Sequence, residues 1–282
     1  MEDNPQNPFS QLLQRRASHT PLGTWVMSAS PLVAEAVGMA GFDWGVIDME
    51  HTPLDMMDLV HMLHAVGNTR MLPVVRVPWN DTVFVKRVLD AGAQTVLFPF
   101  IQDADEAKRA IAATRYPPQG VRGMAGMSRA SRFGTTPDFL RTANRGICAV
   151  LQLETPAAIA RLEEIAAVPG VDGLFVGPGD LSGSMGHVGD ITHADVMAAM
   201  ADAAQRARKL GMPIGTVGGT PEVVARYREI GYDFVAVASD LGMLMRAAQG
   251  ALQAIRGAAT GSAAAASAVP SPAAAPRSTS TY

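Results

Sequence analysis

Side chains suited to acid–base and metal chemistry follow apolar, strand-like segments of the sequence, at the points where those segments end. They are Asp48, His51, Arg76, Gln152, Glu154 and Asp180. Carboxylates bind cations, histidine exchanges protons near neutral pH, and arginine neutralises anions. Together these residue types are suited to a small anionic substrate held beside a cation.

Glu154 and Asp180 end two successive segments, so their carboxylates can share one divalent cation. Oxygen ligands with few other protein donors favour Mg²⁺, and Mn²⁺ or Co²⁺ also fits such a site. The alternative is that each carboxylate caps the helix that follows it, and Thr155-Pro156 is consistent with such a helix start. Spacing alone leaves both interpretations open.

His51 and Arg76 are the candidate base and the candidate anion-binding group. The ordinary pKa of histidine allows His51 to accept a proton near neutrality, although a lone histidine is often only a solvated surface residue. Arg76 ends an apolar strand, where an unpaired guanidinium is costly. It therefore pairs either with an internal carboxylate or with the oxygens of a ligand.

Short apolar runs alternate with segments of helical periodicity along most of the chain. Strands are predicted at 24–28, 44–48, 72–76, 95–98, 148–153, 173–176, 213–216 and 234–238. Helices are predicted at 31–39, 55–65, 82–91, 104–114, 155–165, 194–210, 221–230 and 241–255. Eight such pairs predict a (β/α)₈ barrel, in which catalytic groups lie at the carboxyl ends of the strands. A doubly wound open sheet is the alternative, but no glycine-rich turn follows the first strand.

Composition bounds the function and the domain organisation. Lys and Arg number 23 and Asp and Glu 26 in 282 residues, which excludes a generally basic nucleic-acid binder. The single cysteine, Cys148, is expected to be a buried strand residue. No run is apolar enough to span a membrane, and the polar start leads us to expect a cytoplasmic protein. We expect an N-terminal extension over 1–19, a barrel over 20–257 and a disordered Ala/Ser/Pro tail over 258–282.

The ordered set of motifs resembles one known family. The matching motifs include Asp48-Met49-Glu50-His51, Val75-Arg76-Val77-Pro78-Trp79-Asn80-Asp81, Leu89-Asp90-Ala91-Gly92-Ala93-Gln94, Gln152-Leu153-Glu154-Thr155 and Val176-Gly177-Pro178-Gly179-Asp180-Leu181-Ser182. In this order they resemble the HpcH/HpaI aldolase/citrate lyase family, which includes 4-hydroxy-2-oxoheptanedioate and 2-dehydro-3-deoxyglucarate aldolases. The resemblance covers about residues 23–257 and implies a barrel of the phosphoenolpyruvate/pyruvate type.

The resemblance also implies roles for individual residues. His51 matches the general base, Asp90 the acid that pairs with it, and Arg76 the group that stabilises an enolate. Glu154 and Asp180 match the ligands of a divalent metal, Mg²⁺, Mn²⁺ or Co²⁺. The contacts to the pyruvyl part of the substrate match Gln152 and Gly179, and Asp48 matches a polar residue of the same pocket.

Two residues need separate comment. Asp90 is predicted near the end of the helix 82–91, nominally at the barrel face opposite His51. It must therefore point inward more than expected or come from a neighbouring subunit of the hexamer that the family forms. Trp25, in the first strand, and 217–219, after the seventh, are the candidates for recognising the aldehyde.

The implied reaction is the reversible cleavage of a 4-hydroxy-2-oxo acid to pyruvate and an aldehyde, in sugar-acid or aromatic catabolism. A Schiff-base route would need a lysine at a strand end, whereas Lys86, Lys108 and Lys209 all fall in predicted helices. Two alternatives are an acyl-CoA lyase of the malyl- or citryl-CoA type and a non-catalytic barrel that binds a keto acid. We expect small-molecule substrates, no nucleic acid or membrane partner, and a homo-oligomer.

Overall fold

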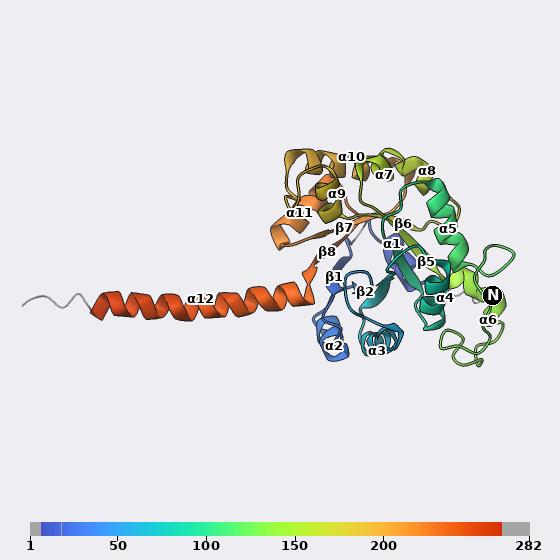
Figure 1. Cartoon of the computed structure of the whole chain (residues 1–282), viewed down its shortest axis with the longest axis horizontal. Helices are drawn as coiled ribbons and strands as arrows, with labels where there is room; N and C mark the ends of the chain where they lie inside the picture. The colour runs from blue at the N-terminus through green and yellow to red at the C-terminus, as the bar shows by residue number, and fades with distance from the viewer. Residues whose placement is uncertain (1–6, 18, 267–282) are drawn as a thin grey trace, which may run out of the picture. The chain divides into compact units, whose positions relative to one another are not determined.

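Eight parallel strands close into a barrel in chain order in the computed structural model, which describes residues 7–17 and 19–266 (Figure 1). The strands are β1 (Leu22–Val26), β2 (Trp44–Asp48), β3 (Leu72–Arg76), β4 (Thr95–Phe98), β5 (Cys148–Leu153), β6 (Gly173–Val176), β7 (Ile214–Gly218) and β8 (Phe234–Ser239). The barrel predicted from the alternating pattern is therefore confirmed. Its parallel strands place all their carboxyl ends at one mouth.

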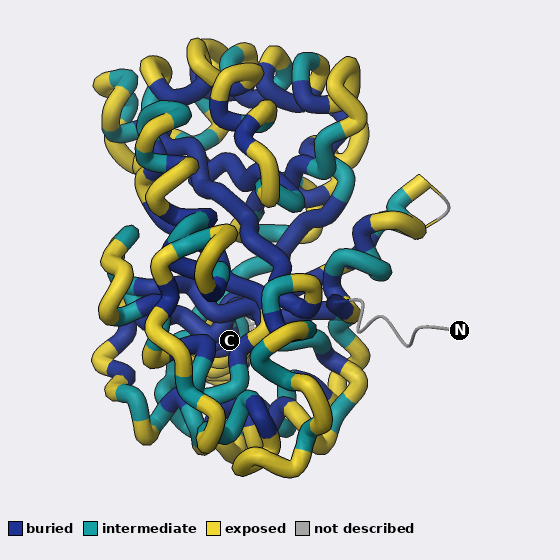
Figure 2. The backbone as a smooth tube through the Cα atoms, turned by 90° about the vertical axis from the view of Figure 1, so that its right-hand side faces the viewer, coloured by how far each residue is buried: buried dark blue, intermediate teal, exposed yellow. Residues whose placement is uncertain are grey.

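Helices surround the barrel on the outside. They are α2 (Pro31–Met39), α3 (Met56–Gly67), α4 (Thr82–Asp90), α5 (Ala104–Thr114), α6 (Phe139–Thr142), α7 (Pro156–Ala160), α8 (Leu162–Ala166), α9 (Pro178–Ser184), α10 (Ala194–Leu210) and α11 (Pro221–Ile230), with a 3₁₀ turn η1 (Ala143–Gly146). The buried stretches of the chain lie inside and the exposed stretches at the periphery (Figure 2). Cys148 is fully buried in β5, as expected, and burial raises the pKa of its thiol.

The first strand is displaced from its prediction because of a carboxylate. Asp240 accepts hydrogen bonds from the backbone amides of Met27 (2.8 Å) and Ser28 (3.0 Å). Those two residues were expected to continue the strand, but their amides turn to the carboxylate and β1 ends at Val26. A side chain more than 200 positions away set this boundary, so the local pattern did not contain it.

The predicted helix 155–165 is divided into α7 and α8 at Arg161. The guanidinium of Arg206 in α10 donates a hydrogen bond to the Ala160 carbonyl at 3.2 Å, and it also pairs with Glu163. A carbonyl that is bonded from outside the helix no longer needs an intrahelical amide, and this is consistent with the break there.

Aromatic side chains fill the barrel interior where glycines on neighbouring strands leave room. A Cβ atom on Gly23 would lie 2.2 Å from the Trp44 ring, and one on Gly215 would lie 2.2 Å from the Phe234 ring. Trp44 and Phe234 pack edge to face with their ring centroids 5.6 Å apart. The two glycines therefore make the close packing of the interior possible.

A short helix, α1 (Pro8–Gln14), closes the amino end of the barrel, although no helix was predicted there. Phe9 is 1% exposed and packs edge to face on both Trp44 and Phe234, and Leu13 is buried in the same cluster. Asn7 caps the helix, and its amide donates to the Gln94 and Gly146 carbonyls ahead of β4 and β5. The segment before β1 therefore contributes to the barrel core.

The last helix, α12 (Asp240–Ala266), continues beyond the residue where the barrel was expected to end. From Gly242 the chain forms a second compact unit. The backbone of α12 thus extends into the first part of the predicted disordered tail, while 267–282 lie outside the described residues. Within the described part of the chain, no helix combines the length and apolarity needed to cross a membrane.

Truncation of the side chain that closes the barrel is expected to destabilise the fold. Phe9→Ala leaves a cavity between two rings, and such changes cost about 3–5 kcal/mol. Chemical denaturation followed by fluorescence measures the change in the free energy of unfolding. Leu32→Ala, at a 77% exposed leucine on α2, is the control and should stay within about 0.5 kcal/mol. Equal effects of the two variants would show that α1 does not complete the core.

Candidate active site

A buried ion pair joins the carboxyl ends of β2 and β3. Asp48 and Arg76 are partners in the strand register, and both side chains are buried. The guanidinium donates from Nε to Asp48 Oδ1 at 2.9 Å and from Nη2 to Oδ2 at 2.6 Å. This bidentate contact fixes the plane of the guanidinium. The pairing of Arg76 with an internal carboxylate, one of the two alternatives from sequence, is therefore present.

Glu50 joins this pair and brings His51 to the mouth. Glu50 Oε2 lies 2.9 Å from Arg76 Nη1 and 3.8 Å from His51 Nε2. Asp48 Oδ1 also accepts the backbone amides of Glu50 and His51, which shapes the loop after β2. The His51 side chain is 57% exposed, so its imidazole is accessible to a substrate.

Glu50 had no role in the sequence analysis, although it stands beside His51. Burial raises the pKa of its carboxyl group, and the positive charge of Arg76 opposes that shift. Its position between a guanidinium and an imidazole gives it a part in orienting both. The acidic run before His51 was the only signal in the sequence that pointed to it.

Gln152 and Glu154 form a second group at the end of β5, and both are 2% exposed. Gln152 Nε2 donates to Glu154 Oε1 at 2.6 Å, and the Phe100 amide donates to Oε2 at 2.9 Å. Phe100 has a φ of 55°, a left-handed conformation that is unfavourable for a residue with a side chain. The hydrogen bond to a carboxylate compensates for part of this cost. The Phe100 amide was not predicted as a site group, because no side-chain pattern encodes it.

Asp180 lies beside Glu154, on the short helix α9 that follows β6. Burial, followed by the negative charge of Asp180, raises the pKa of Glu154 to about 8. The charge of Asp180 also raises the pKa of Glu50, and that of Glu50 raises the pKa of Glu154. The two groups of residues therefore interact across one barrel mouth, as their sequence positions predicted.

Trp25 and Gly179 occupy different environments at this end of the barrel. Trp25 is buried in the interior, packs on Phe175, and lies under Arg76, whose guanidinium carbon is 5.4 Å from the ring centroid. This cation–π contact supports the guanidinium from below. Gly179, by contrast, is exposed on α9, with open space around the position of a Cβ atom.

Asp90 is not brought to His51 within one chain. It ends α4, and its Oδ1 accepts a hydrogen bond from Arg122 Nη2 at 2.6 Å. Arg122 is 1% exposed and stacks over the Tyr116 ring at 4.4 Å, so it holds Asp90 near the amino ends of the strands. The first option from sequence, an inward-pointing Asp90 in the same subunit, does not agree with this geometry.

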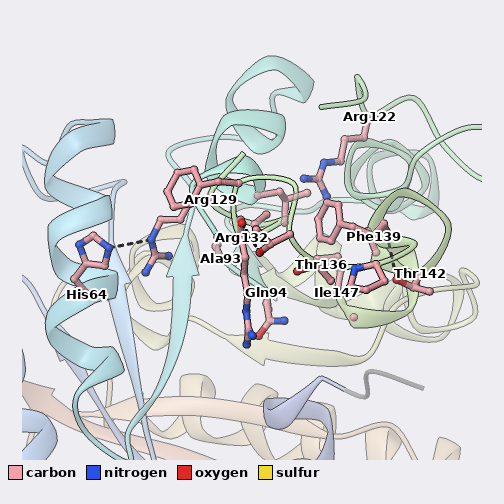
Figure 3. A pocket seen from close by; sticks show the side chains of 18 residues that line it. His64, Ala93, Gln94, Arg122, Arg129, Arg132, Thr136, Phe139, Thr142 and Ile147 are labelled. Atoms are coloured by element: carbon pink, nitrogen blue, oxygen red, sulfur yellow. Dashed lines mark hydrogen bonds between the residues drawn. The ribbon is translucent and has the colours of Figure 1, made fainter. Parts of the chain in front are cut away.

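A cavity of about 1050 Å³ lies at that same amino end (Figure 3). Residues just before β4 and β5 line it, together with Arg122, Arg129 and Arg132 from the long connection after α5. Arg129 Nε donates to His64 Nε2 at 3.2 Å across one side of the cavity. None of the candidate catalytic residues at the opposite mouth of the barrel lines this cavity. The cavity is therefore separate from the candidate active site, despite its large volume.

Several relatives of known name match most of the chain in sequence. It is 52% identical over 246 residues to 2-dehydro-3,6-dideoxy-6-sulfogluconate aldolase of Pseudomonas putida, with 87% of this chain and 96% of that protein covered. It is 44% identical over 245 residues to a pyruvate aldolase of Rhizobium etli, with the same two shares. A 5-keto-4-deoxy-D-glucarate aldolase of Salmonella arizonae is 43% identical over 233 residues, with shares of 83% and 91%.

Solved structures give the same result. An HpcH/HpaI aldolase/citrate lyase family protein from Burkholderia cenocepacia superimposes with a TM-score of 0.83 at 43% identity, over 88% of this chain and 99% of that one. Macrophomate synthase superimposes with a TM-score of 0.79 at 29% identity, covering 92% of each chain. The family model for HpcH/HpaI aldolase/citrate lyase matches residues 22–247. With the site residues of the barrel mouth inside that range, the chain belongs to the HpcH/HpaI aldolase/citrate lyase family.

Proposed function

We propose that this protein is a metal-dependent aldolase that reversibly cleaves a 4-hydroxy-2-oxo acid to pyruvate and an aldehyde. The observation that carries the proposal is one barrel mouth in which a buried guanidinium and an accessible imidazole face a pair of carboxylates. The aldolase names of the relatives support the same reaction.

The carboxylate pair fits a divalent cation, which we propose to be Mg²⁺, Mn²⁺ or Co²⁺ held by Glu154 and Asp180. The negative charge of Asp180 raises the pKa of Glu154, and a positive charge between the two carboxylates would relieve this repulsion. Buried Gln152 Oε1 has no hydrogen-bond donor among the described residues, so it is available to a ligand or a water at this point. When bound, the cation supplies positive charge for the carboxylate and keto oxygens of the substrate.

The remaining steps belong to side chains of the chain. His51 takes the proton from the C4 hydroxyl, the C3–C4 bond breaks, and its electron pair moves onto the keto oxygen as an enolate. Arg76 stabilises that negative charge, because its contacts with carboxylates of the described residues use three of its five N–H groups and leave two that can donate to the enolate. A proton is then delivered to C3, either the one that His51 has taken or one from water, which gives pyruvate, and the aldehyde departs.

We propose that the substrate is derived from a sugar acid. Two relatives are named for dehydro (keto), deoxy forms of sulfogluconate and glucarate, which carry hydroxylated chains. In this assignment Gln152 and Gly179 contact the pyruvyl part and Trp25 and Asp48 position Arg76. The aldehyde part extends toward the loop after β7, where a Cβ atom on Gly219 would meet nothing within 4 Å.

We propose further that Asp90 acts from a neighbouring subunit of a homohexamer. In its own subunit Asp90 pairs with Arg122 and lies away from His51. The connection that carries Arg122 exposes Met124, Met127 and Phe133, at 60%, 77% and 68%. An apolar patch of this kind on a surface loop is typical of a subunit contact.

Incubation with oxaloacetate and Mg²⁺ or Mn²⁺ is expected to release pyruvate, because decarboxylation passes through the same enolate as aldol cleavage. A lactate dehydrogenase assay measures the pyruvate, and EDTA should stop its release. Condensation of pyruvate with a panel of aldehydes then identifies the acceptor by the adduct that forms fastest. The proposed mechanism would be ruled out if no pyruvate were released and if EDTA abolished none of the protein's activities.

His51→Ala is expected to lower the rate of aldol cleavage about 10²- to 10⁴-fold, the usual contribution of a general base. Because the His51 side chain is 57% exposed and is not one of the proposed metal ligands, Mn²⁺ binding measured by electron paramagnetic resonance should be nearly unchanged. His61→Ala, at an exposed histidine on α3, is the matched control. Turnover in His51→Ala equal to the control would contradict the assignment of the base.

Gly177→Ala is expected to weaken metal binding by about tenfold or more, since displaced supporting groups of metal sites cost about 10- to 100-fold. A Cβ atom there would lie 2.4 Å from Glu154 Oε1 and 2.8 Å from Gln152 Nε2. Gly183→Ala in α9, where a Cβ atom meets nothing within 4 Å, is the control and should bind Mn²⁺ as the wild type does. Equal affinities in titration calorimetry would show that Glu154 is not a ligand.

A further inference from the structure

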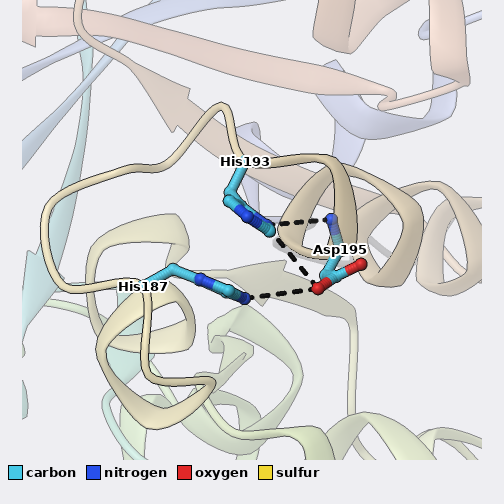
Figure 4. Close-up of side chains that lie close together, drawn as sticks. All are labelled: His187, His193 and Asp195. Carbon is cyan, nitrogen blue, oxygen red and sulfur yellow. Dashed lines mark hydrogen bonds and ion pairs between the residues drawn. The ribbon is translucent and has the colours of Figure 1, made fainter.

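Two histidines and one aspartate converge between α9 and α10, apart from the residues assigned above (Figure 4). The rings of His187 and His193 stack with centroids 3.5 Å apart at 15°. Asp195 Oδ2 lies 3.3 Å from His187 Nε2 and 3.7 Å from His193 Nδ1. Among the residues that the structure describes, this is the one group of three or more His, Cys, Asp or Glu whose ligand atoms gather within 4.8 Å.

The backbone of the connecting loop holds the two histidines together. Gly186 and Gly189 have φ values of 83° and 79°, a conformation that glycine adopts without strain. The His187 amide donates to the Ser182 carbonyl at 2.8 Å, and the Asp190 amide donates to the His187 carbonyl at 2.9 Å. The loop is therefore bonded to α9 and folded on itself, so the two rings are held in place by more than their own contact.

The N-terminus of α10 fixes the other side of the cluster. His193 caps this helix, and its Nδ1 accepts the backbone amide of Asp195 at 3.2 Å. Nδ1 therefore carries a lone pair, so this nitrogen is available to a metal ion in place of the amide hydrogen.

The donor types identify the class of ion. Two imidazole nitrogens and one carboxylate oxygen are ligands for Zn²⁺ and similar first-row ions, whereas Mg²⁺ prefers oxygen ligands alone. The side chains of His187, His193 and Asp195 are 27%, 36% and 67% exposed, so an ion can enter from solvent. Water completes the coordination of a site with three protein ligands.

We propose that His187, His193 and Asp195 form a second metal site, specific for Zn²⁺-type ions and distinct from the Glu154–Asp180 site. When an ion binds, the Nε2 atom of His187 contacts the ion instead of Asp195. The Nδ1 atom of His193 likewise contacts the ion instead of the backbone amide of Asp195. The two rings turn from parallel so that their in-plane lone pairs meet at one point. The ion would tie the loop after α9 to the first turn of α10, and the proposal does not depend on the reaction at the barrel mouth.

Zn²⁺ titration of the full chain by calorimetry tests the proposal, with Glu154→Gln as the background because it removes one ligand of the other site. We expect one Zn²⁺ per chain in this background, not displaced by millimolar Mg²⁺. His187→Ala, His193→Ala and Asp195→Asn should each weaken it by at least about tenfold, since even supporting partners of metal sites contribute about 10- to 100-fold. His61→Ala, at an exposed histidine elsewhere, should leave the affinity unchanged.

Two further readouts separate a built site from an incidental surface histidine. Zn²⁺ should raise the melting temperature of the Glu154→Gln chain and fail to do so in the His193→Ala double variant, since only a ligand bound to the folded state stabilises it. Circular dichroism establishes that each variant is folded. Absence of Zn²⁺ binding in Glu154→Gln, or equal affinities in the His187→Ala, His193→Ala and His61→Ala variants, would overturn the proposal.

Discussion

The buried pair of Asp48 and Arg76 is the interaction on which the barrel mouth depends. A guanidinium taken out of water needs its charge and its N–H groups satisfied, and loss of one partner of such a pair costs about 3–5 kcal/mol. Asp48 meets this need from the neighbouring strand, directly opposite Arg76 in the register. The same carboxylate also accepts the amides of the loop that carries His51. The buried carboxylate of Asp48 thus orients the guanidinium of Arg76 and also holds the backbone of the loop that carries His51.

On the other side of the barrel mouth, around Glu154 and Asp180, negative charge lacks a positive partner in the described part of the protein. Glu154 is buried beside Asp180 with a raised pKa, so negative charge there is not balanced by the protein alone. Arg76, by contrast, is already matched by Asp48 and Glu50. The side with excess negative charge is suited to a cation, and the side with the fixed guanidinium is suited to developing negative charge.

The features that the sequence predicted correctly are those that follow from its repeating pattern and from neighbouring residues. Alternating apolar and helical periods predicted the eight-stranded barrel, and the strand ends predicted which side chains share the mouth, because parallel strands converge there. It did not predict features that depend on distant partners. The end of β1 follows Asp240, the break between α7 and α8 coincides with a contact of Arg206, and Phe100 contributes an amide. The His187–His193 contact depends on a loop whose path no periodicity describes.

The close packing of aromatic rings against glycines inside the barrel has a consequence for related sequences. Gly23 lies against the Trp44 ring and Gly215 against the Phe234 ring, each too closely for any added carbon. A larger residue at either glycine is therefore tolerated only with a smaller one at its partner. These two pairs of positions, each on adjacent strands, should vary together among homologues while their summed volume stays nearly constant.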